Sequence, residues 1–299
     1  MGTVVEIAFI GENQEKAEKA ALQAFHEVRR IEQLMSPKIE TGDVFRINQS
    51  AGKEWVEVSP ETLHVVKKSI DISGLSEGGF DITVGPLIEL WRRARGKGYP
   101  PAEKDLRRSL DLVGFQNVLI SQGGKIFLKK NGMSIDLGGI AKGYAVDKAF
   151  EKLKKLGYQN LIVNAGGDLR AGGLKLGQPW SIGIQDPRIP DKILAKVSFT
   201  DGAIATSGDY EKYFTYQGKR YHHILNPRNG LPAEECQSVT TLYKDGMISD
   251  AFSTTVFVLG PEKGYSLCQR VGGMDCLIVD KEGKIILSPG LKDRISFIP

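Results

Sequence analysis

The chain has 299 residues, of which 41% are hydrophobic and 25% are charged, a composition typical of a globular protein with a large core. Its net charge of +4 comes from 40 basic and 36 acidic residues mixed along the chain, which argues against a nucleic-acid-binding surface. Three cysteines without CxxC spacing argue against a disulfide scaffold and a structural zinc site, and no apolar run is long enough to span a membrane.

The amino-terminal part of the chain is predicted to form one strand and two helices. The opening residues, MGTVVEIAFIG, are typical of a strand. Residues 13–35 have apolar positions three and four residues apart, which predicts a long amphipathic helix. A second helix is predicted to start after the N-cap residue Ser59, with Pro60 in its first turn, and to end near Gly74.

The rest of the chain is rich in predicted strands. The predicted strands are interrupted by a helix that ends at Gly157 and by another helix over 247–260. A last helix–strand pair follows the second of these helices. The strand-rich segments cover residues 117–120, 125–130, 133–137, 160–173, 179–186, 195–232 and 236–244. Because strands come in consecutive runs and not in strict alternation with helices, we expect an α+β fold, in one domain or two tightly packed lobes.

A glycine-rich turn is predicted at residues 138–143, between the strand that ends near Asp136 and the following helix. Such a turn presents free backbone N–H groups to an anion, and Lys142 adds a positive charge at the same place. Taken alone, this stretch favours a tight strand-to-helix turn without a ligand, since neither a P-loop nor a GxGxxG pattern is present.

Two further stretches combine glycines with polar residues. Residues 78–87 place a double glycine before Pro86, and residues 164–173 place Asp168 after a buried-strand pattern. Turns between elements are the alternative explanation for both stretches.

The carboxyl-terminal half contains a pair of histidines and a pair of oxygen donors. His222 and His223 alternate faces on a predicted strand, so one side chain points inward and the other outward. Asp250 and Thr254 lie four residues apart on one face of a helix, and a carboxylate with a hydroxyl suits Mg²⁺. The alternative is that Asp250 is the N-cap of this helix.

Nine motifs, in the same order along the chain, resemble the ApbE family, the FAD:protein FMN transferases. They span Met1 to about Gly260 and are MGTVVEI, IEQLMS, FRIN, GGFDITVGPL, DLGGIAKGYAVD, NAGGD, ATSGDYEKYF, YHHILNPRNGLP and SDAFSTT. The resemblance implies the family's T-fold-like architecture over residues 1–299, an α+β arrangement of antiparallel sheets with packed helices.

The same resemblance implies a function. Members of the family bind FAD and Mg²⁺, transfer the FMN half of FAD to a threonine hydroxyl of an acceptor protein and release AMP. The acceptor expected here is a flavoprotein with a threonine-containing motif, such as a membrane redox subunit. Some members hydrolyse FAD to FMN and AMP, so a Mg²⁺-dependent FAD pyrophosphatase is one alternative, and a non-catalytic flavin-binding protein is another.

The resemblance also implies the residues of the site. The Mg²⁺ ligands are the backbone carbonyl of Ala141 and the side chains of Asp250 and Thr254, and the glycines before them bring main chain close to a pyrophosphate. His223 is the expected base for the acceptor threonine, or a nucleophile that attacks phosphorus itself. The FAD contacts are Met35, Ser36, Gly79, Phe80, Asp81, Lys142, Tyr144, Asp147, Asp168, Thr206 and His223.

The sequence departs from the family pattern at two places. Asn226 stands where the family commonly has Asp, and Asn229 where Thr is usual. If that Asp only caps a turn, Asn can replace it, whereas transfer is impaired if it orients the base. Many relatives carry an export leader and a lipid-attached cysteine, which the start of this chain lacks. We expect a periplasmic or outer-face membrane-attached protein if a leader was removed, and a cytoplasmic one otherwise.

Overall fold

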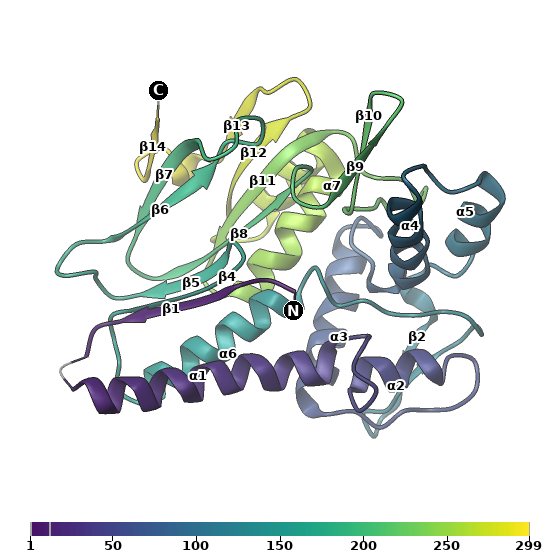
Figure 1. The fold of residues 1–299 in the computed structure, drawn as a ribbon, viewed down its shortest axis with the longest axis horizontal. Helices are drawn as coiled ribbons and strands as arrows, with labels where there is room; N and C mark the ends of the chain where they lie inside the picture. The colour runs from purple at the N-terminus through teal and green to yellow at the C-terminus, as the bar shows by residue number, and fades with distance from the viewer. Residues whose placement is uncertain (1, 12, 299) are drawn as a thin grey trace. The chain divides into compact units, whose positions relative to one another are not determined.

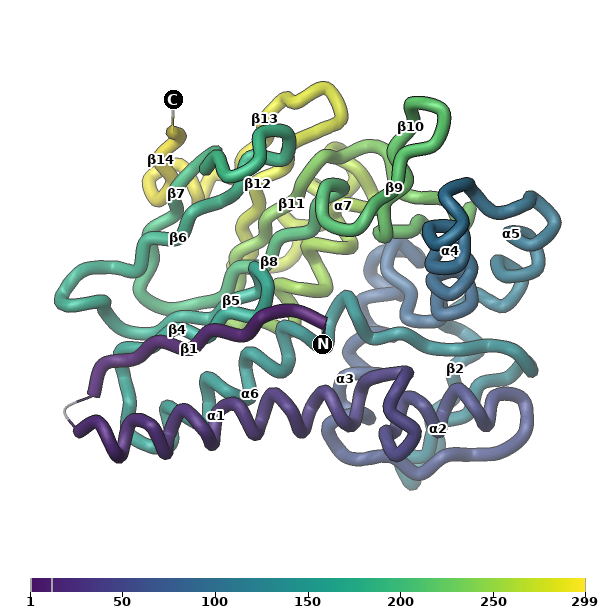
Figure 2. The backbone as a smooth tube through the Cα atoms, viewed as in Figure 1, coloured from purple at the N-terminus to yellow at the C-terminus, as the bar shows by residue number. Residues whose placement is uncertain are grey.

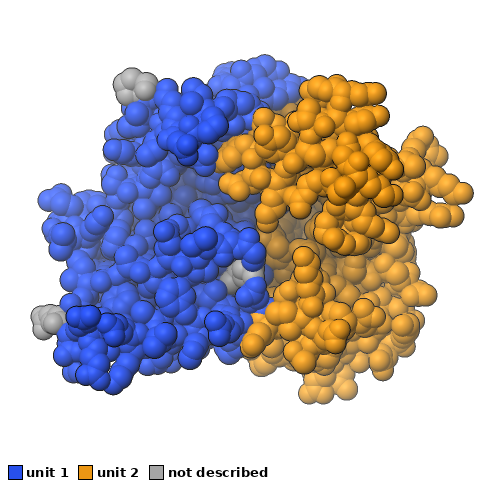
Figure 3. Space-filling view, in the orientation of Figure 1, with its two compact units in different colours: residues 1–32, 140–208, 236–299 blue, residues 33–139, 209–235 orange. Residues whose placement is uncertain are grey.

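The computed structural model describes residues 2–11 and 13–298, and it divides into two compact units (Figures 1 and 3). Unit 1 consists of residues 1–32, 140–208 and 236–299, and unit 2 of residues 33–139 and 209–235. In the part of the chain that is described, no helix is both long and apolar enough to cross a membrane. The grouping of the units into one domain or two lobes stays a prediction.

Unit 1 is built on a seven-stranded sheet in which every pairing is antiparallel. Figure 2 traces the backbone through its strands. In spatial order its strands are β1 (Val5–Phe9), β4 (Leu161–Ala165), β5 (Asp168–Gly172), β8 (Gly202–Gly208), β11 (Cys236–Tyr243), β12 (Asp275–Asp280) and β13 (Ile285–Leu287). All but the last residue of β11 are buried, as expected for a strand paired on both sides.

Two helices lie against one face of this sheet. Helix α6 (Ala141–Lys155) contacts β4 and β5, and α7 (Gly246–Arg270) contacts β8, β11 and β12 as well as α6. Gly260 (φ 80°) and Pro261 break α7 into two helical segments. The long helix α1 (Gln14–Met35) follows β1.

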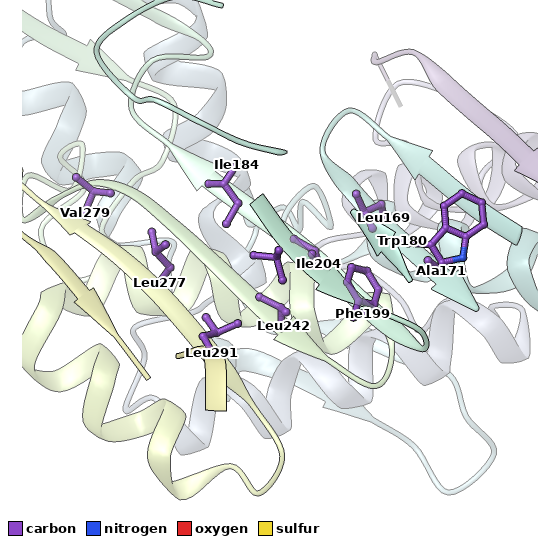
Figure 4. Close-up of a cluster of buried hydrophobic side chains, with 11 residues drawn as sticks. Leu169, Ala171, Trp180, Ile184, Phe199, Ile204, Leu242, Leu277, Val279 and Leu291 are labelled. Carbon is purple, nitrogen blue, oxygen red and sulfur yellow. The ribbon is translucent and has the colours of Figure 1, made fainter. Parts of the chain in front are cut away.

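A hydrophobic cluster fills the opposite face of the large sheet (Figure 4). It is covered by a three-stranded sheet in the order β14 (Ile295–Phe297), β7 (Ile193–Phe199) and β6 (Trp180–Gln185), with the short helix η3 (Pro289–Leu291) beside it. Leu169, Ile204 and Leu242 point into this cluster. Because side chains alternate along a strand, their sequence neighbours point to the helix-covered face, which carries the polar groups described below.

Unit 2 is mainly helical and has its own cluster around Leu87, Trp91, Ala94 and Leu225. The Trp91 ring stacks on Tyr221, and its Nε1–H donates to the carbonyl of Gly230 at 2.8 Å. The elements of unit 2 are α2 (Asp43–Gln49), α3 (Pro60–Leu75), η1 (Ile82–Val84), α4 (Gly85–Lys97), α5 (Glu103–Leu110), η2 (Phe115–Asn117) and the hairpins β2 (Val118–Ile120)–β3 (Ile126–Leu128) and β9 (Tyr213–Tyr216)–β10 (Lys219–His222).

The predicted helix boundaries are confirmed where capping chemistry sets them. The Ser59 hydroxyl accepts the Thr62 N–H at 3.1 Å, and Gly157 takes a left-handed conformation (φ 96°) after α6.

The strand prediction for residues 133–137 was wrong: these residues are described and form no strand. Their apolar side chains are buried, but the Asp136 N–H pairs with the Ile82 carbonyl of a 3₁₀ turn instead of with a strand.

Gly143 is required by the close approach of α6 to α7. A Cβ there would clash with the carbonyl oxygen of Gly246 and lie 2.8 Å from the Cβ of Asp250. We therefore expect Gly143→Ala to lower the free energy of unfolding by at least about 2 kcal/mol, measured by urea denaturation.

Gly96, near the end of α4, provides the matched control because a Cβ there meets no atom within 4 Å. Gly96→Ala should keep or raise stability by up to about 1 kcal/mol, as helix propensity dictates. If Gly143→Ala is as stable as Gly96→Ala, α6 and α7 do not approach each other as closely as they do in this structure.

Candidate functional site

Three charged side chains meet on the helix-covered face of the large sheet in unit 1. The Lys142 ammonium, from the first turn of α6, lies 2.5 Å from Asp168 Oδ2 and 3.1 Å from Asp250 Oδ1. Asp168 is the first residue of β5, and Asp250 lies in the second turn of α7. The two carboxylates are buried, with side chains 4% and 3% exposed, so they can remain charged only beside a cation.

Burial and mutual repulsion shift the titration of these groups. Burial and, to a smaller extent, the charge of Asp250 raise the pKa of Asp168 to about 7, although Lys142 opposes both effects. Burial alone would lower the pKa of Lys142, but the charges and hydrogen bonds of the two carboxylates hold it well above its ordinary value. The lysine is therefore a permanent positive charge at neutral pH.

The main chain at the start of α6 fixes the position of Asp250. The Gly143 N–H donates to Asp250 Oδ2 at 2.9 Å, so this amide of the glycine-rich turn already has an acceptor. Gly138 and Gly143 do not have positive φ. The glycine at 143 is therefore explained by the close approach of α7 to α6, and it also brings Asp250 within reach of the turn.

The amino terminus of α7 is anchored by other aspartates. Asp245 is its N-cap and accepts the Ile248 N–H at 3.0 Å, which excludes the alternative that Asp250 is the cap. Asp147 of α6 accepts the N–H groups of Gly246 (2.8 Å) and Met247 (2.9 Å) and pairs with Arg170. Burial raises the pKa of Asp147, although Arg170 and the two amides lower it. Asp147 thus sets the position of α7.

Hydroxyl groups line the same face beside Asp250. Ser207 Oγ hydrogen-bonds with Ser253 Oγ (2.9 Å) and Thr254 Oγ1 (3.2 Å). The Thr206 side chain points to the other face of the sheet, where it bonds to Thr240 at 2.8 Å, and its backbone N–H donates to Asp168. Sequence reasoning missed Ser207, although strand alternation in the ATSGD motif could have found it.

The donor set fits a magnesium ion. No group of three or more His, Cys, Asp or Glu side chains able to hold a metal occurs among residues 2–11 and 13–298. Mg²⁺, however, takes one or two carboxylates and fills its remaining positions with water and phosphate oxygens. Asp168 and Asp250 already converge on one cation, the Lys142 ammonium, and the Thr254 hydroxyl lies one helical turn from Asp250. The predicted ligand role of the Ala141 carbonyl stays a prediction.

Tyr144 and Asp147 complete the predicted contacts in unit 1. The Tyr144 ring is buried, and the Lys148 ammonium lies 5.2 Å from its centroid. Both residues belong to α6 and follow Lys142 within two turns. Contact of either with FAD stays a prediction.

In unit 2, the predicted contacts at 79–81 form part of a tightly bonded turn. Asp81 Oδ1 accepts the Thr83 N–H at 2.8 Å and the Thr83 hydroxyl at 2.6 Å, and Oδ2 accepts the Phe115 N–H at 2.8 Å. Burial raises the pKa of Asp81 against the effect of these bonds. Gly79 and Phe80 are buried and bond through their N–H groups to Ser76. These contacts give Asp81 a structural role, and its contact with FAD stays a prediction.

Met35 and Ser36 lie at the carboxyl end of α1. Met35 is buried, whereas Ser36 is half-buried and accepts the Lys38 N–H at 3.3 Å. Contact of either residue with FAD stays a prediction.

The two histidines point to opposite sides, as predicted. His222 is buried: its Nδ1 accepts the Ile224 N–H at 3.2 Å, so Nε2 carries the proton and donates to the Ala233 carbonyl at 2.7 Å. Burial lowers the pKa of His222. His223 is exposed. His222 thus has a structural role, and the catalytic role of His223 stays a prediction.

The two asparagines that depart from the family pattern cap turns. Asn226 Oδ1 accepts the Arg228 N–H at 3.0 Å, and Asn229 Oδ1 accepts the Leu231 N–H at 2.9 Å. Arg228 in turn donates to the carbonyls of Ser76 (3.3 Å) and Glu77 (3.1 Å), which ties this loop to the turn before Gly79. The Asn226 contact supports the turn-capping explanation of the substitution.

Comparison with known proteins gives consistent matches over nearly the whole chain. The model of the ApbE family matches residues 1–278. Proteins named FAD:protein FMN transferase from Klebsiella pneumoniae (strain 342) and Vibrio cholerae serotype O1 are 33% and 34% identical, over 93% and 90% of this chain and 88% and 82% of their own.

Solved structures give the same result. The ApbE protein from Thermotoga maritima is 37% identical with a TM-score of 0.90, and flavin transferase ApbE from Vibrio cholerae is 31% identical with a TM-score of 0.86. Each match covers 98% of this chain and 96% of the other. The predicted α+β fold of antiparallel sheets with packed helices is confirmed.

Because His222 is buried in its neutral form, its pKa is lower in the folded than in the unfolded protein. Its contribution to stability is therefore complete above about pH 6.5 and is lost as the pH falls below that value, with a slope of up to about 1.4 kcal/mol per pH unit. His222→Gln should flatten the decline of the melting temperature between about pH 7.5 and 5. The exposed His26 is the control: His26→Gln should keep the decline, and an equal decline in both variants would contradict the prediction.

Since a carboxylate oxygen accepts an N–H as an amide oxygen does, Asn226→Asp should keep the free energy of unfolding within about 0.5 kcal/mol. Asn226→Ala should lose about 1 kcal/mol, because the Arg228 N–H then loses its acceptor. Chemical denaturation of the three proteins measures both differences. Equal losses in the two variants would mean that the cap does not hold this turn.

Proposed function

The chain belongs to the ApbE family, and on this premise we propose that it transfers the FMN half of FAD to a threonine hydroxyl of an acceptor protein, with Mg²⁺ and with release of AMP. The relatives are named FAD:protein FMN transferase, so the expected enzyme class, a flavin transferase, is confirmed. The metal, the threonine and the release of AMP belong to the proposal.

The observation that carries the proposal is the pair of buried carboxylates, Asp168 and Asp250, around one cation. A pyrophosphate brings several negative charges, and its cleavage adds charge to the leaving oxygen, so a site for it needs positive charge close by. A core without a ligand gains nothing from two buried carboxylates that repel each other. The arrangement therefore supports a site for a cation and a phosphate ester better than a structural role.

Each residue has a distinct task in the proposed site. Asp250, Thr254 and the Ala141 carbonyl would hold Mg²⁺, which when bound supplies positive charge to the phosphate oxygens. Asp147 positions Asp250 through the amino terminus of α7. Lys142 provides a second positive charge in the first turn of α6, close to the amino-terminal end of the helix dipole.

The chemistry is a substitution at the FMN phosphorus. A bond forms from the acceptor threonine oxygen to this phosphorus, and the bond from phosphorus to the bridging oxygen of the AMP half breaks. The proton of the threonine hydroxyl passes to a base, and we assign this task to the exposed His223. The alternative is that His223 attacks phosphorus first and passes the FMN group on. The proposed partner is a flavoprotein with a threonine-containing motif.

Asp250→Asn should lower the rate of FMN transfer at least about 100-fold, because the site loses one charged metal ligand. The assay incubates the protein with FAD and a threonine-containing acceptor peptide, with and without Mg²⁺, and measures AMP release and the mass of the peptide. Asp245→Asn on the same helix is the matched control, since Asn caps a helix as well as Asp, and it should leave the rate unchanged.

The products distinguish the alternatives. A peptide that gains one FMN group only with Mg²⁺ supports transfer, whereas free FMN and AMP with an unmodified peptide indicate an FAD pyrophosphatase. Bound FAD without any AMP would exclude both activities and leave a flavin-binding protein. Full activity of Asp250→Asn would exclude the proposed metal site.

A further inference from the structure

Lys142 pairs with Asp250, the carboxylate that the proposed metal needs. Its ammonium contacts Asp168 Oδ2 and Asp250 Oδ1, and Asp250 Oδ2 is already taken by the Gly143 N–H. The Asp250 oxygen that faces the site is thus the one paired with lysine. Asp168 Oδ2 is buried and lies 2.5 Å from the Lys142 ammonium.

An ammonium and a divalent cation cannot share this place. Two ionised carboxylates with one lysine carry a net charge of −1, and two cations a few Å apart beside buried groups repel each other strongly. The side chain of Lys142 is 29% exposed and has a flexible four-carbon stem, so it can move away from the carboxylates without disturbing the helix.

We propose that Lys142 is a built-in counter-ion that occupies the Asp168–Asp250 pair in the metal-free protein and is displaced when Mg²⁺ binds. This inference rests on the proposed function, because it takes Asp250 as a metal ligand. The exchange leaves a cation beside the buried carboxylates in both states. It also couples the two cations: the metal releases the ammonium, which becomes available to the phosphate groups of FAD only when the metal is in place.

Calorimetric titration of the metal-free protein with MgCl₂, without FAD, tests this competition. Lys142→Met removes the competing charge and should bind Mg²⁺ at least about tenfold more tightly than the wild type, and its melting temperature without metal should be lower. Lys148→Met is the matched control, because Lys148 lies on the same helix with the same 29% side-chain exposure and pairs with Glu151 instead. It should bind Mg²⁺ as the wild type does.

A second measurement uses the unmodified protein and does not depend on the folding of a variant. Lysine side chains are acetylated briefly with a limiting reagent, with and without Mg²⁺, and each site is quantified by mass spectrometry. Mg²⁺ should raise the labelling of Lys142 several-fold and leave that of Lys148 unchanged.

The outcomes separate failure of the inference from failure of the proposed function. If the wild type binds Mg²⁺ and Asp250→Asn does not, but Lys142→Met binds no more tightly and the labelling of Lys142 is unchanged, the counter-ion role is overturned and the metal site stands. If Asp250→Asn binds Mg²⁺ as tightly as the wild type, the metal site is wrong and the counter-ion role is overturned with it.

Discussion

The close approach of α6 and α7 at Gly143 and Gly246 is the constraint on which the site depends. With no side chain at 143, the carbonyl of Gly246 packs directly on α6, and the Gly143 amide reaches the Asp250 carboxylate. Asp147, one turn further along α6, then accepts two free amides at the start of α7. Two helices that meet through backbone have little freedom to slide, so each charged group is held within hydrogen-bonding distance of its partners.

The two faces of the large sheet differ in polarity. One face carries the apolar cluster around Leu169, Ile204 and Leu242, and the other carries Asp168, Arg170 and Ser207 from the same or neighbouring strands. Strand alternation alone produces this division, because adjacent residues of β5 and β8 must face opposite ways. The apolar face stabilises the sheet, and the polar face can therefore hold buried charge without making unit 1 depend on it.

Several features could be predicted from the sequence because they depend on local patterns. The cap at Ser59, the left-handed Gly157, the opposite directions of His222 and His223, and the helix that carries Asp250 and Thr254 all follow from spacing of a few residues. The fold class followed from the order of strands and helices.

Contacts between distant parts of the chain could not be predicted in this way. The pairing of Lys142 with Asp168 and Asp250, 26 and 108 residues away, arises only from the packing of α6 on α7 and β5. The same packing places Asp147 where it accepts N–H groups at the start of α7. It also accounts for the glycine at position 143 without a ligand. Residues 133–137 have the composition of a strand, but the backbone next to them offers a 3₁₀ turn and no strand to pair with. Their hydrophobic pattern indicates burial, and buried segments that are not strands can have the same pattern.

The order in which the strands of the large sheet are synthesised affects how the nascent chain folds. Strand β8 ends at residue 208, but its outer partner β11 begins only at residue 236, after the second stretch of unit 2. After β8 has left the ribosome and until β11 has followed it, β8 has an unpaired edge, and such edges attract other chains. Asp250 leaves the ribosome later still, so Asp168 and Lys142 lack their shared partner until then. Nascent chains of this protein are therefore most exposed to misassociation in the interval before β11 leaves the ribosome.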